Sequence, residues 1–212
     1  MKISFYGAAG EVTGSKHLIQ TENYNLLLDC GLHQGHWKEA NALNRELPMP
    51  AKSVNAVILS HGHLDHCGML PVLVKNGFRG NIYATTATAD IAQYILADSA
   101  RIQEQNAAHF NRNLPDNATP SEPLYTEEDA NAVQSYFKPT PYFRLKPHWT
   151  QVSEKIRFKF LDAGHILGSA LTVLEVQEGG KTIRVGYTGD IGKPGNPLLH
   201  DPEPFREPLD AL

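Results

Sequence analysis

The stretch that decides the fold of this chain is Val54-Asn55-Ala56-Val57-Ile58-Leu59-Ser60-His61-Gly62-His63-Leu64-Asp65-His66. Its first half is short, rich in aliphatic and β-branched residues, and soon followed by glycine, which predicts a buried strand. Its second half, the hexapeptide that begins at His61, places four potential metal ligands where that strand meets a loop. A metal site needs ligands held by a rigid element, and the end of a buried strand supplies one.

The spacing within the hexapeptide favours a metal site over an ordinary polar loop. His61 and His63 are two residues apart, so they point the same way in an extended segment. Asp65 and His66 follow after a turn and can reach a second point nearby. Imidazole and carboxylate ligands together suit zinc or a similar divalent ion. A lone pair of histidines would fit a polar loop, but the full combination predicts a metal site.

The composition is ordinary for a soluble globular protein. The chain has 212 residues, of which 41% are hydrophobic and 20% charged, enough to bury a core. No apolar stretch approaches the ~20 residues that a membrane-spanning helix needs. Cys30 and Cys67 cannot make a disulfide framework, so we expect a reducing cytoplasm and two small buried side chains. Asn117-Ala118-Thr119 matches a glycosylation sequon, which we interpret as a polar loop because the N-terminus reads as a strand rather than a signal peptide.

The net charge of −4 disfavours unaided binding of nucleic acid, because phosphate neutralisation needs clustered Lys and Arg. One segment departs from this balance. Between Lys138 and Lys159 the basic residues outnumber the single acid, Glu154, and aromatic residues are interleaved, a pattern that could form a path with stacking platforms. However, Lys155, Arg157 and Lys159 alternate with apolar residues, as in a half-buried strand with a charged outer face. We favour this second interpretation for those three.

The remaining pattern predicts strands in both end thirds of the chain and helices between them. We expect strands at residues 3–6, 17–20, 26–29, 56–59, 82–84, 142–145, 156–160, 171–176 and 182–187. We expect helices at residues 68–77, 88–111 and 126–137, the second with an apolar stripe made of Ile91, Ala92, Ile95 and Ile102. Strands joined by helical crossovers indicate an α/β sandwich.

Three more strand ends carry a ligand-type residue next to glycine. They are Asp29 in Leu28-Asp29-Cys30-Gly31, His165 in Ala163-Gly164-His165-Ile166-Leu167-Gly168-Ser169-Ala170, and Asp190 in Thr188-Gly189-Asp190-Ile191-Gly192. Glycine lets the backbone pass close to an ion or a substrate. Each segment alone is a weak signal, but in this order, with the hexapeptide, they indicate one site.

These segments together resemble the metallo-β-lactamase fold hydrolases, at that family's first four motifs. More narrowly, Gly7-Ala8-Ala9-Gly10-Glu11-Val12-Thr13-Gly14-Ser15, Leu28-Asp29-Cys30-Gly31 and the segment around His165 resemble the β-CASP branch, which contains RNA-processing nucleases. The resemblance covers essentially the whole chain. It implies an αββα metallo-β-lactamase sandwich that binds two zinc ions, the second partly bound or replaced by manganese.

The resemblance also implies a role for each candidate residue. The metal ligands would be His61, His63 and His165 at the first zinc, and Asp65 and His66 at the second, with Asp190 bridging. Asp29 would orient ligands and solvent, and the candidate catalytic acids are Asp65, Asp190 and Asp29. His33 and His36 could approach the site, but we favour a loop role for both.

The family pattern implies an organisation that continues past Leu212. We assign residues 1–192 to the N-terminal part of a metallo-β-lactamase-like domain and the proline-rich residues 193–212 to a connection toward a β-CASP cap domain. In the family, a histidine that completes the second zinc follows the cap. We therefore expect a sandwich that is incomplete at the C-terminus and a chain with little or no activity by itself.

The resulting hypothesis is a zinc-dependent metallohydrolase that cleaves RNA phosphodiesters, as an endo- or exoribonuclease in RNA processing. Two divalent ions ~3.5–4 Å apart lower the pKa of water toward ~7 and neutralise charge on the attacked and leaving oxygens. The expected partner is single-stranded RNA rather than a membrane. The sequence does not decide whether the protein forms a homodimer. Two alternatives remain: hydrolysis of a small-molecule ester, thioester or lactam by the same metal site, and a non-catalytic partner subunit.

Overall fold

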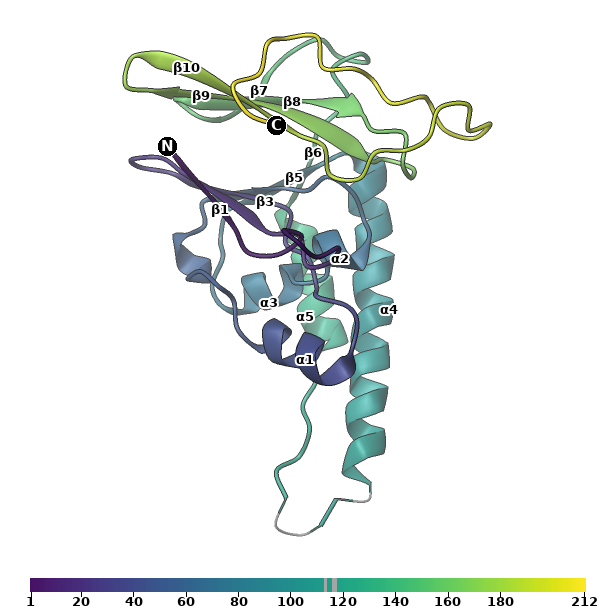
Figure 1. Ribbon diagram of the computed structural model, residues 1–212. Helices are drawn as coiled ribbons and strands as arrows, with labels where there is room; N and C mark the ends of the chain where they lie inside the picture. The colour runs from purple at the N-terminus through teal and green to yellow at the C-terminus, as the bar shows by residue number, and fades with distance from the viewer. Residues whose placement is uncertain (113, 116–117) are drawn as a thin grey trace.

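The protein is described by a computed structural model that covers residues 1–112, 114–115 and 118–212, so Asn117 of the sequon lies outside the described residues. Two β-sheets pack face to face, and helices α1 to α5 gather on the outer side of the larger sheet (Figure 1). This arrangement confirms the predicted α/β sandwich. No helix in the described ranges is long and apolar enough to cross a membrane.

The larger sheet has six strands in sequence order. They are β1 Lys2–Phe5, β2 His17–Gln20, β3 Asn25–Leu28, β4 Ala56–Ile58, β5 Asn81–Ala84 and β6 Phe137–Pro139. The pairs β1·β2 and β2·β3 are antiparallel, whereas β3 to β6 run parallel. Parallel neighbours require crossover connections, and these carry the helices.

The smaller sheet is antiparallel throughout, in the order β10-β9-β8-β7. Its strands are β7 Thr150–Ser153, β8 Ile156–Asp162, β9 Ala170–Glu178 and β10 Lys181–Tyr187. The helices are α1 Trp37–Arg45, α2 Leu64–Cys67, α3 Leu70–Lys75, α4 Thr86–Asn111 and α5 Glu127–Ala132, with short 3₁₀ helices at Ala51–Ser53 and Val133–Tyr136.

The core is divided by the larger sheet into two layers, because successive side chains of a strand point to opposite faces. Leu27 and Val57 face the helices and join one buried cluster, which also holds Cys30 and Cys67. Ile58 and its neighbours face the smaller sheet and join a second cluster. Both cysteines are free and buried, as expected from the sequence. Since the central strands are buried on both faces, their sequences read as continuous apolar runs.

Helix α4 corrects the predicted apolar stripe. Its buried face consists of small residues with one leucine: Thr88, Ala89, Ala92, Leu96, Ser99, Ala100 and Ala107. Ile95 and Ile102 are exposed instead, at 36% and 47%, and line a groove between α1 and α4. The prediction placed the large apolar side chains on the buried face, whereas the helix packs through small residues that let its neighbours approach closely.

The segment before the smaller sheet holds the other errors. The predicted strand at residues 142–145 is wrong: Tyr142 makes only an isolated bridge to Phe160 and the residues after it form a turn. Strands β6 and β7 were missed, because each is short and lies beside prolines or polar residues. The helix predicted over 126–137 stops at Ala132 and continues as 3₁₀ helix. The helix predicted over 68–77 is preceded by a separate helical turn, α2, so Asp65 lies on a helix.

Arg144, Arg157 and Lys159 of the 138–159 segment form ion pairs with acidic residues. Lys159 is buried, pairs with Glu207 and lies 4.3 Å from the centre of the Phe143 ring. Arg157 pairs with Glu175 at 2.6 Å. These pairs support the half-buried strand over a path for nucleic acid. Residues 201–211 cross the outer face of the smaller sheet and bond to it, for example from the amide N of Gly186 to the carbonyl O of Ala211 at 2.9 Å (Figure 1). The division at residue 192 stays a prediction.

Candidate metal centre

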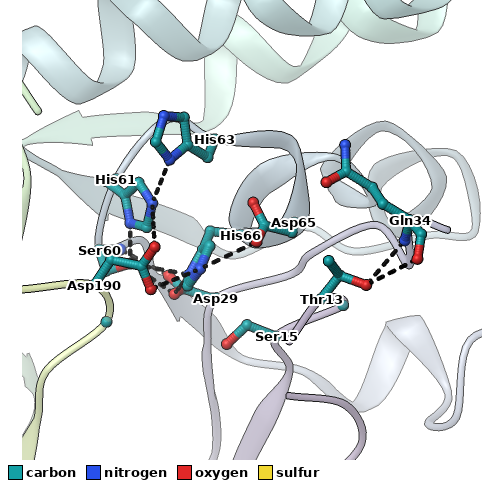
Figure 2. A network of polar contacts seen from close by, with 12 residues as sticks. Thr13, Ser15, Asp29, Gln34, Ser60, His61, His63, Asp65, His66 and Asp190 are labelled. Atoms are coloured by element: carbon teal, nitrogen blue, oxygen red, sulfur yellow. Dashed lines mark hydrogen bonds and ion pairs between the residues drawn. The ribbon is translucent and has the colours of Figure 1, made fainter. Parts of the chain in front are cut away.

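The fold brings all seven predicted site residues to one edge of the sandwich. Asp29 follows β3 and His61 follows β4; because these strands are parallel, their carboxyl ends meet at the same edge. His165 follows β8 and Asp190 follows β10, two strands that run in the same direction because each is antiparallel to β9. Asp65 and His66 lie on α2, which begins just after the hexapeptide's second histidine (Figure 2).

The first cluster contains four ligand atoms that lie within 4.8 Å of one another, from His61, His63, His165 and Asp190. His61 Nε2 lies 3.1 Å from His63 Nδ1, and His165 Nε2 lies 3.3 Å from the same His63 atom. Asp190 Oδ2 lies 3.4 Å from His165 Nε2 and 3.8 Å from His61 Nε2. The three imidazole rings meet edge to face, with centroids 4.8–5.0 Å apart.

These distances fit a tetrahedral divalent ion. Zinc–nitrogen bonds of about 2.0–2.1 Å in tetrahedral geometry place the ligand atoms about 3.3–3.4 Å apart. Four of the six separations between ligand atoms run from 3.1 to 3.8 Å, and all six lie within 4.8 Å. Nitrogens this close need either a ring proton or a bound cation between them. The donor set and its spacing therefore suit zinc or a similar metal.

A second, smaller cluster shares Asp190 with the first. His66 Nε2 lies 3.4 Å from Asp190 Oδ1 and 3.8 Å from Asp65 Oδ2. The two oxygens of the Asp190 carboxylate therefore face different groups of histidines. This is the geometry that a carboxylate needs to bridge two ions.

The pKa shifts of His61 and His165 in the first cluster suit metal binding. Burial, followed by the charge of His66, lowers the pKa of His61 to about 3, so its lone pair is free at neutral pH. Burial also lowers the pKa of His165. Burial would lower the pKa of His66 as well, but the hydrogen bond and charge of Asp29 outweigh it and raise that pKa. At His61, a contact of 3.0 Å between Nδ1 and Ser60 Oγ leaves Nε2 to face the cluster.

Asp29 is fully buried behind the clusters and touches His66 rather than the first cluster. Its carboxylate accepts from Ser60 N at 2.7 Å, and from Ser60 Oγ and His66 Nδ1 at 2.6 Å each (Figure 2). It also accepts from Tyr187 OH at 2.6 Å. Burial alone would raise the pKa of Asp29, but the bond and charge of His66 outweigh it and lower that pKa. An ionised carboxylate on Nδ1 fixes the ring of His66 and directs Nε2 toward the second cluster.

Two glycines allow the site segments to approach each other. A Cβ on Gly31 would lie 1.7 Å from the carbonyl O of Asp65, and one on Gly192 would lie 1.7 Å from the carbonyl O of Gly164. A real Cβ has no such contacts, so a side chain at either position would push a ligand-bearing segment away. Glycine at these positions follows from the close packing of the loops that carry Asp65, His165 and Asp190.

The two further histidines considered from the sequence, His33 and His36, lie outside the clusters. His33 packs its ring against Gly14, and its Nδ1 lies 3.7 Å from Glu11 Oε2. His36 is the residue at the N-cap of α1. Neither belongs to the potential metal group found among the described residues. This agrees with the loop role favoured from the sequence.

Three polar residues around Asp29 were not assigned from the sequence. Ser60 contacts both Asp29 and His61, and Tyr187 donates to Asp29. Ser15 lies 3.0 Å from the hydroxyl of Tyr187. Ser60 directly precedes the hexapeptide and Tyr187 precedes the Asp190 segment, so both positions were visible in the sequence. Only the fold shows that the side chains of Ser60 and Tyr187 both reach Asp29.

The comparisons with known proteins give a family model and several relatives that match the chain. The model of the metallo-beta-lactamase superfamily matches residues 10–211. The chain is 35% identical over 202 residues to ribonuclease TTHA0252 of Thermus thermophilus, which covers 95% of this chain and 40% of that protein. It is 30% identical over 194 residues to cleavage and polyadenylation specificity factor 73 of Drosophila melanogaster, covering 91% and 25%. The chain thus spans less than half the length of these curated relatives.

Solved structures support the fold alone. A metallo-beta-lactamase of Cronobacter sakazakii matches with a TM-score of 0.51 and 17% identity, covering 92% of this chain and 58% of that chain. MEM-A1, a subclass B3 metallo-beta-lactamase from a soil metagenome library, matches with a TM-score of 0.50 and 16% identity, covering 94% and 67%. These matches confirm the fold class predicted from the sequence.

Proposed function

Because the chain belongs to the metallo-beta-lactamase superfamily, we propose that it forms the metal-binding part of a zinc-dependent hydrolase that cleaves single-stranded RNA. The narrower resemblance to β-CASP RNA-processing nucleases is supported by relatives that are named as a ribonuclease and an endoribonuclease. In this proposal, the chain binds one to two equivalents of zinc, and manganese can replace the zinc.

The observation that carries the proposal is the position of Asp190 between two groups of metal-type side chains. Its Oδ2 lies 3.4 Å from His165, and its Oδ1 lies 3.4 Å from His66. In the proposal, the first ion takes His61, His63 and His165, and the second takes Asp65 and His66. Asp190 belongs to both, which would hold two ions at the short separation that phosphodiester hydrolysis uses.

The chain's own residues supply binding, orientation and an open face. Bound divalent ions would lower the pKa of water and neutralise charge on the phosphate oxygens. The low pKa of His61 keeps a lone pair available for an ion at neutral pH. Asp29, through Nδ1 of His66, holds that ring toward the second cluster. The side chains of His165 and Asp190 are 26% and 44% exposed, so a phosphodiester can reach the clusters from solvent.

We propose further that this chain alone has little or no nuclease activity. It spans 40% of ribonuclease TTHA0252, and in the proposal the surface that clamps RNA lies in the rest of such a protein. The net charge of −4 and the pairing of Lys159 with Glu207 leave this chain poorly equipped to hold a polyanion. The two buried free thiols support the cytoplasmic setting that is part of the proposal.

The test is cleavage of labelled single-stranded RNA by this chain and by a protein of its relatives' length that contains it, each with and without a chelator. We expect the longer protein to cut RNA, to stop when metal is removed, and to fail as the Asp190→Ala variant. Cleavage that survives the chelator would contradict the metal-dependent mechanism. Hydrolysis of a thioester or a lactam, without cleavage of RNA, would move the assignment to a small-molecule substrate.

A further inference from the structure

A chain of polar contacts leads from Asp29 away from the metal clusters. The hydroxyl of Tyr187 donates to Asp29 Oδ2 at 2.6 Å. On its other side that hydroxyl lies 3.0 Å from Ser15 Oγ, and Ser15 Oγ lies 3.2 Å from His17 Nε2. Ser15 closes the glycine-rich segment 7–15, which the proposed function leaves without a role.

The protons that these groups carry allow only one donor-to-acceptor direction along this series of polar contacts. An ionised Asp29 only accepts, so the single proton of Tyr187 points to it. Ser15 must then donate its own proton to the Tyr187 oxygen. The oxygen of Ser15 is left to accept, which requires a proton on His17 Nε2. The contacts therefore run from His17 to Ser15, to Tyr187 and to Asp29.

The state of His17 agrees independently with this direction. Its Nδ1 is buried and has no hydrogen-bond partner among the described residues. A neutral imidazole carries one proton, so a proton on Nε2 leaves Nδ1 as a bare acceptor, which costs less to bury than an unpaired N–H. Burial also lowers the pKa of His17, although the charge of Asp29 opposes this. The ring of Tyr187 contacts that of His17 edge to face, with centroids 5.5 Å apart.

The position of Ser15 is fixed by its backbone as well. Its amide N donates to the carbonyl O of Asp65 at 2.9 Å, and its carbonyl O accepts from the amide N of Gly31 at 2.9 Å. Ser15 is therefore held between α2 and the end of β3. Tyr187 comes from the opposite sheet, at the end of β10. Together they join the two sheets directly behind His66.

We propose that Tyr187 and Ser15 are positioning residues for His66, acting through Asp29; this inference rests on the proposed metal-binding function. Three donors meet at Asp29 Oδ2, and Tyr187 is the one that comes from the smaller sheet. Without it the carboxylate keeps its bonds from Ser60 and His66 but loses its support from that sheet, so the acceptor of the Nδ1–H of His66 is held less firmly. The Nε2 lone pair then no longer points steadily at the second cluster.

The test is a titration of metal-free chain with zinc against a competing chromophoric chelator, which gives the two stepwise affinities. In the Tyr187→Phe variant we expect the weaker step to fall by about 10–100-fold, the size of effect typical when a residue that orients a ligand is removed. We expect the stronger step to stay within about threefold of the wild type. Ser15→Ala should shift the weaker step in the same direction by less. With cobalt(II), the visible spectrum of the second equivalent should change in both variants.

The chain offers a matched control. Tyr125 is also buried and donates its hydroxyl to Ser99 Oγ at 2.9 Å, in the helical layer. Tyr125→Phe and Ser99→Ala remove the same kind of bond and should leave both zinc affinities unchanged. A double variant, Tyr187→Phe with Asp29→Ala, should bind zinc no worse than Asp29→Ala alone, because Tyr187 acts through Asp29.

The outcomes separate the two proposals. A wild-type chain that binds no zinc would overturn the proposed function. A wild-type chain that binds zinc in two steps, with Tyr187→Phe and Ser15→Ala both behaving like Tyr125→Phe, would overturn the inference alone. Binding in a single step that neither variant weakens would also overturn it. If Tyr187→Phe does not fold, Ser15→Ala decides, because it leaves the Tyr187 ring in place.

Discussion

Replacing Gly192 by alanine should separate the two loops that carry His165 and Asp190. The added Cβ would lie 1.7 Å from the carbonyl O of Gly164 and 2.7 Å from the amide N of His165, where real Cβ contacts start at about 3.0 Å. The loops must therefore part by more than 1 Å, whereas metal–ligand distances tolerate only about 0.2 Å. The amide of Gly192 would also lose its 2.9 Å bond to the carbonyl O of Ala163.

The displacement acts directly on the first cluster. Asp190 Oδ2 and His165 Nε2 are 3.4 Å apart, and a further separation of about 1 Å would exceed what one tetrahedral ion can span. We expect the Gly192→Ala chain to bind zinc at least about 100-fold more weakly than the wild type, the upper end of what disturbing a ligand's supports causes. The measurement is competition against a chromophoric chelator, with the folded state checked by circular dichroism.

Gly80→Ala is the matched control. A Cβ on Gly80 would lie 1.9 Å from the carbonyl O of Asn55, a clash of similar severity at the other end of β4. Both variants should lose stability, but only Gly192→Ala should lose zinc affinity beyond what unfolding explains. If the two variants bind zinc equally well, or if both retain wild-type affinity, the reasoning about the spacing of these loops is wrong.

Three further predictions follow from the site and from one ion pair. Asp190→Ala should lose more zinc, by elemental analysis, than Asp29→Ala, because Asp190 serves both clusters while Asp29 acts through His66; equal losses would mean that one role is misassigned. A chelator should lower the melting temperature of the wild-type chain, since zinc at 100 times its Kd stabilises by about 2.7 kcal/mol. The chelator should lower the melting temperature of His61→Ala by less, because that variant lacks one ligand of the first cluster; equal shifts would argue against this metal site. Burial would raise the pKa of Glu175, but the bonds from Arg184 and Arg157 outweigh it and lower that pKa below 4.5. The stabilisation from Glu175 is therefore present above about pH 4.5 and is lost as pH falls through the folded pKa. Urea titrations should show that Glu175→Gln loses less stability than the wild type on acidification, and equal losses would refute this.

The proposed ligand residues were visible in the sequence because each follows a strand and stands beside glycine or in a dense motif. Asp29, His165 and Asp190 follow β3, β8 and β10 within a few residues, and parallel strands bring such ends to one edge. Local pattern is enough for this kind of prediction. The residue types then limit the chemistry to a metal site.

The supporting contacts could not be predicted, because they depend on packing between distant segments. Ser15 and Tyr187 are 172 residues apart in sequence and meet only across the two sheets. The exposure of Ile95 depends on the small-residue face of α4 packing inward. The absence of a strand after Tyr142 in this described segment reflects side-chain packing rather than the apolar pattern. Tertiary contacts decided each of these features.

X-ray diffraction from zinc-loaded crystals, collected on both sides of the zinc absorption edge, tests the central claim most directly. The account predicts an anomalous peak among His61, His63, His165 and Asp190, and a second, weaker peak beside His66, about 3.5–4 Å away on the other side of the Asp190 carboxylate. No anomalous peak at these side chains, or zinc held only elsewhere on the chain, would contradict the account.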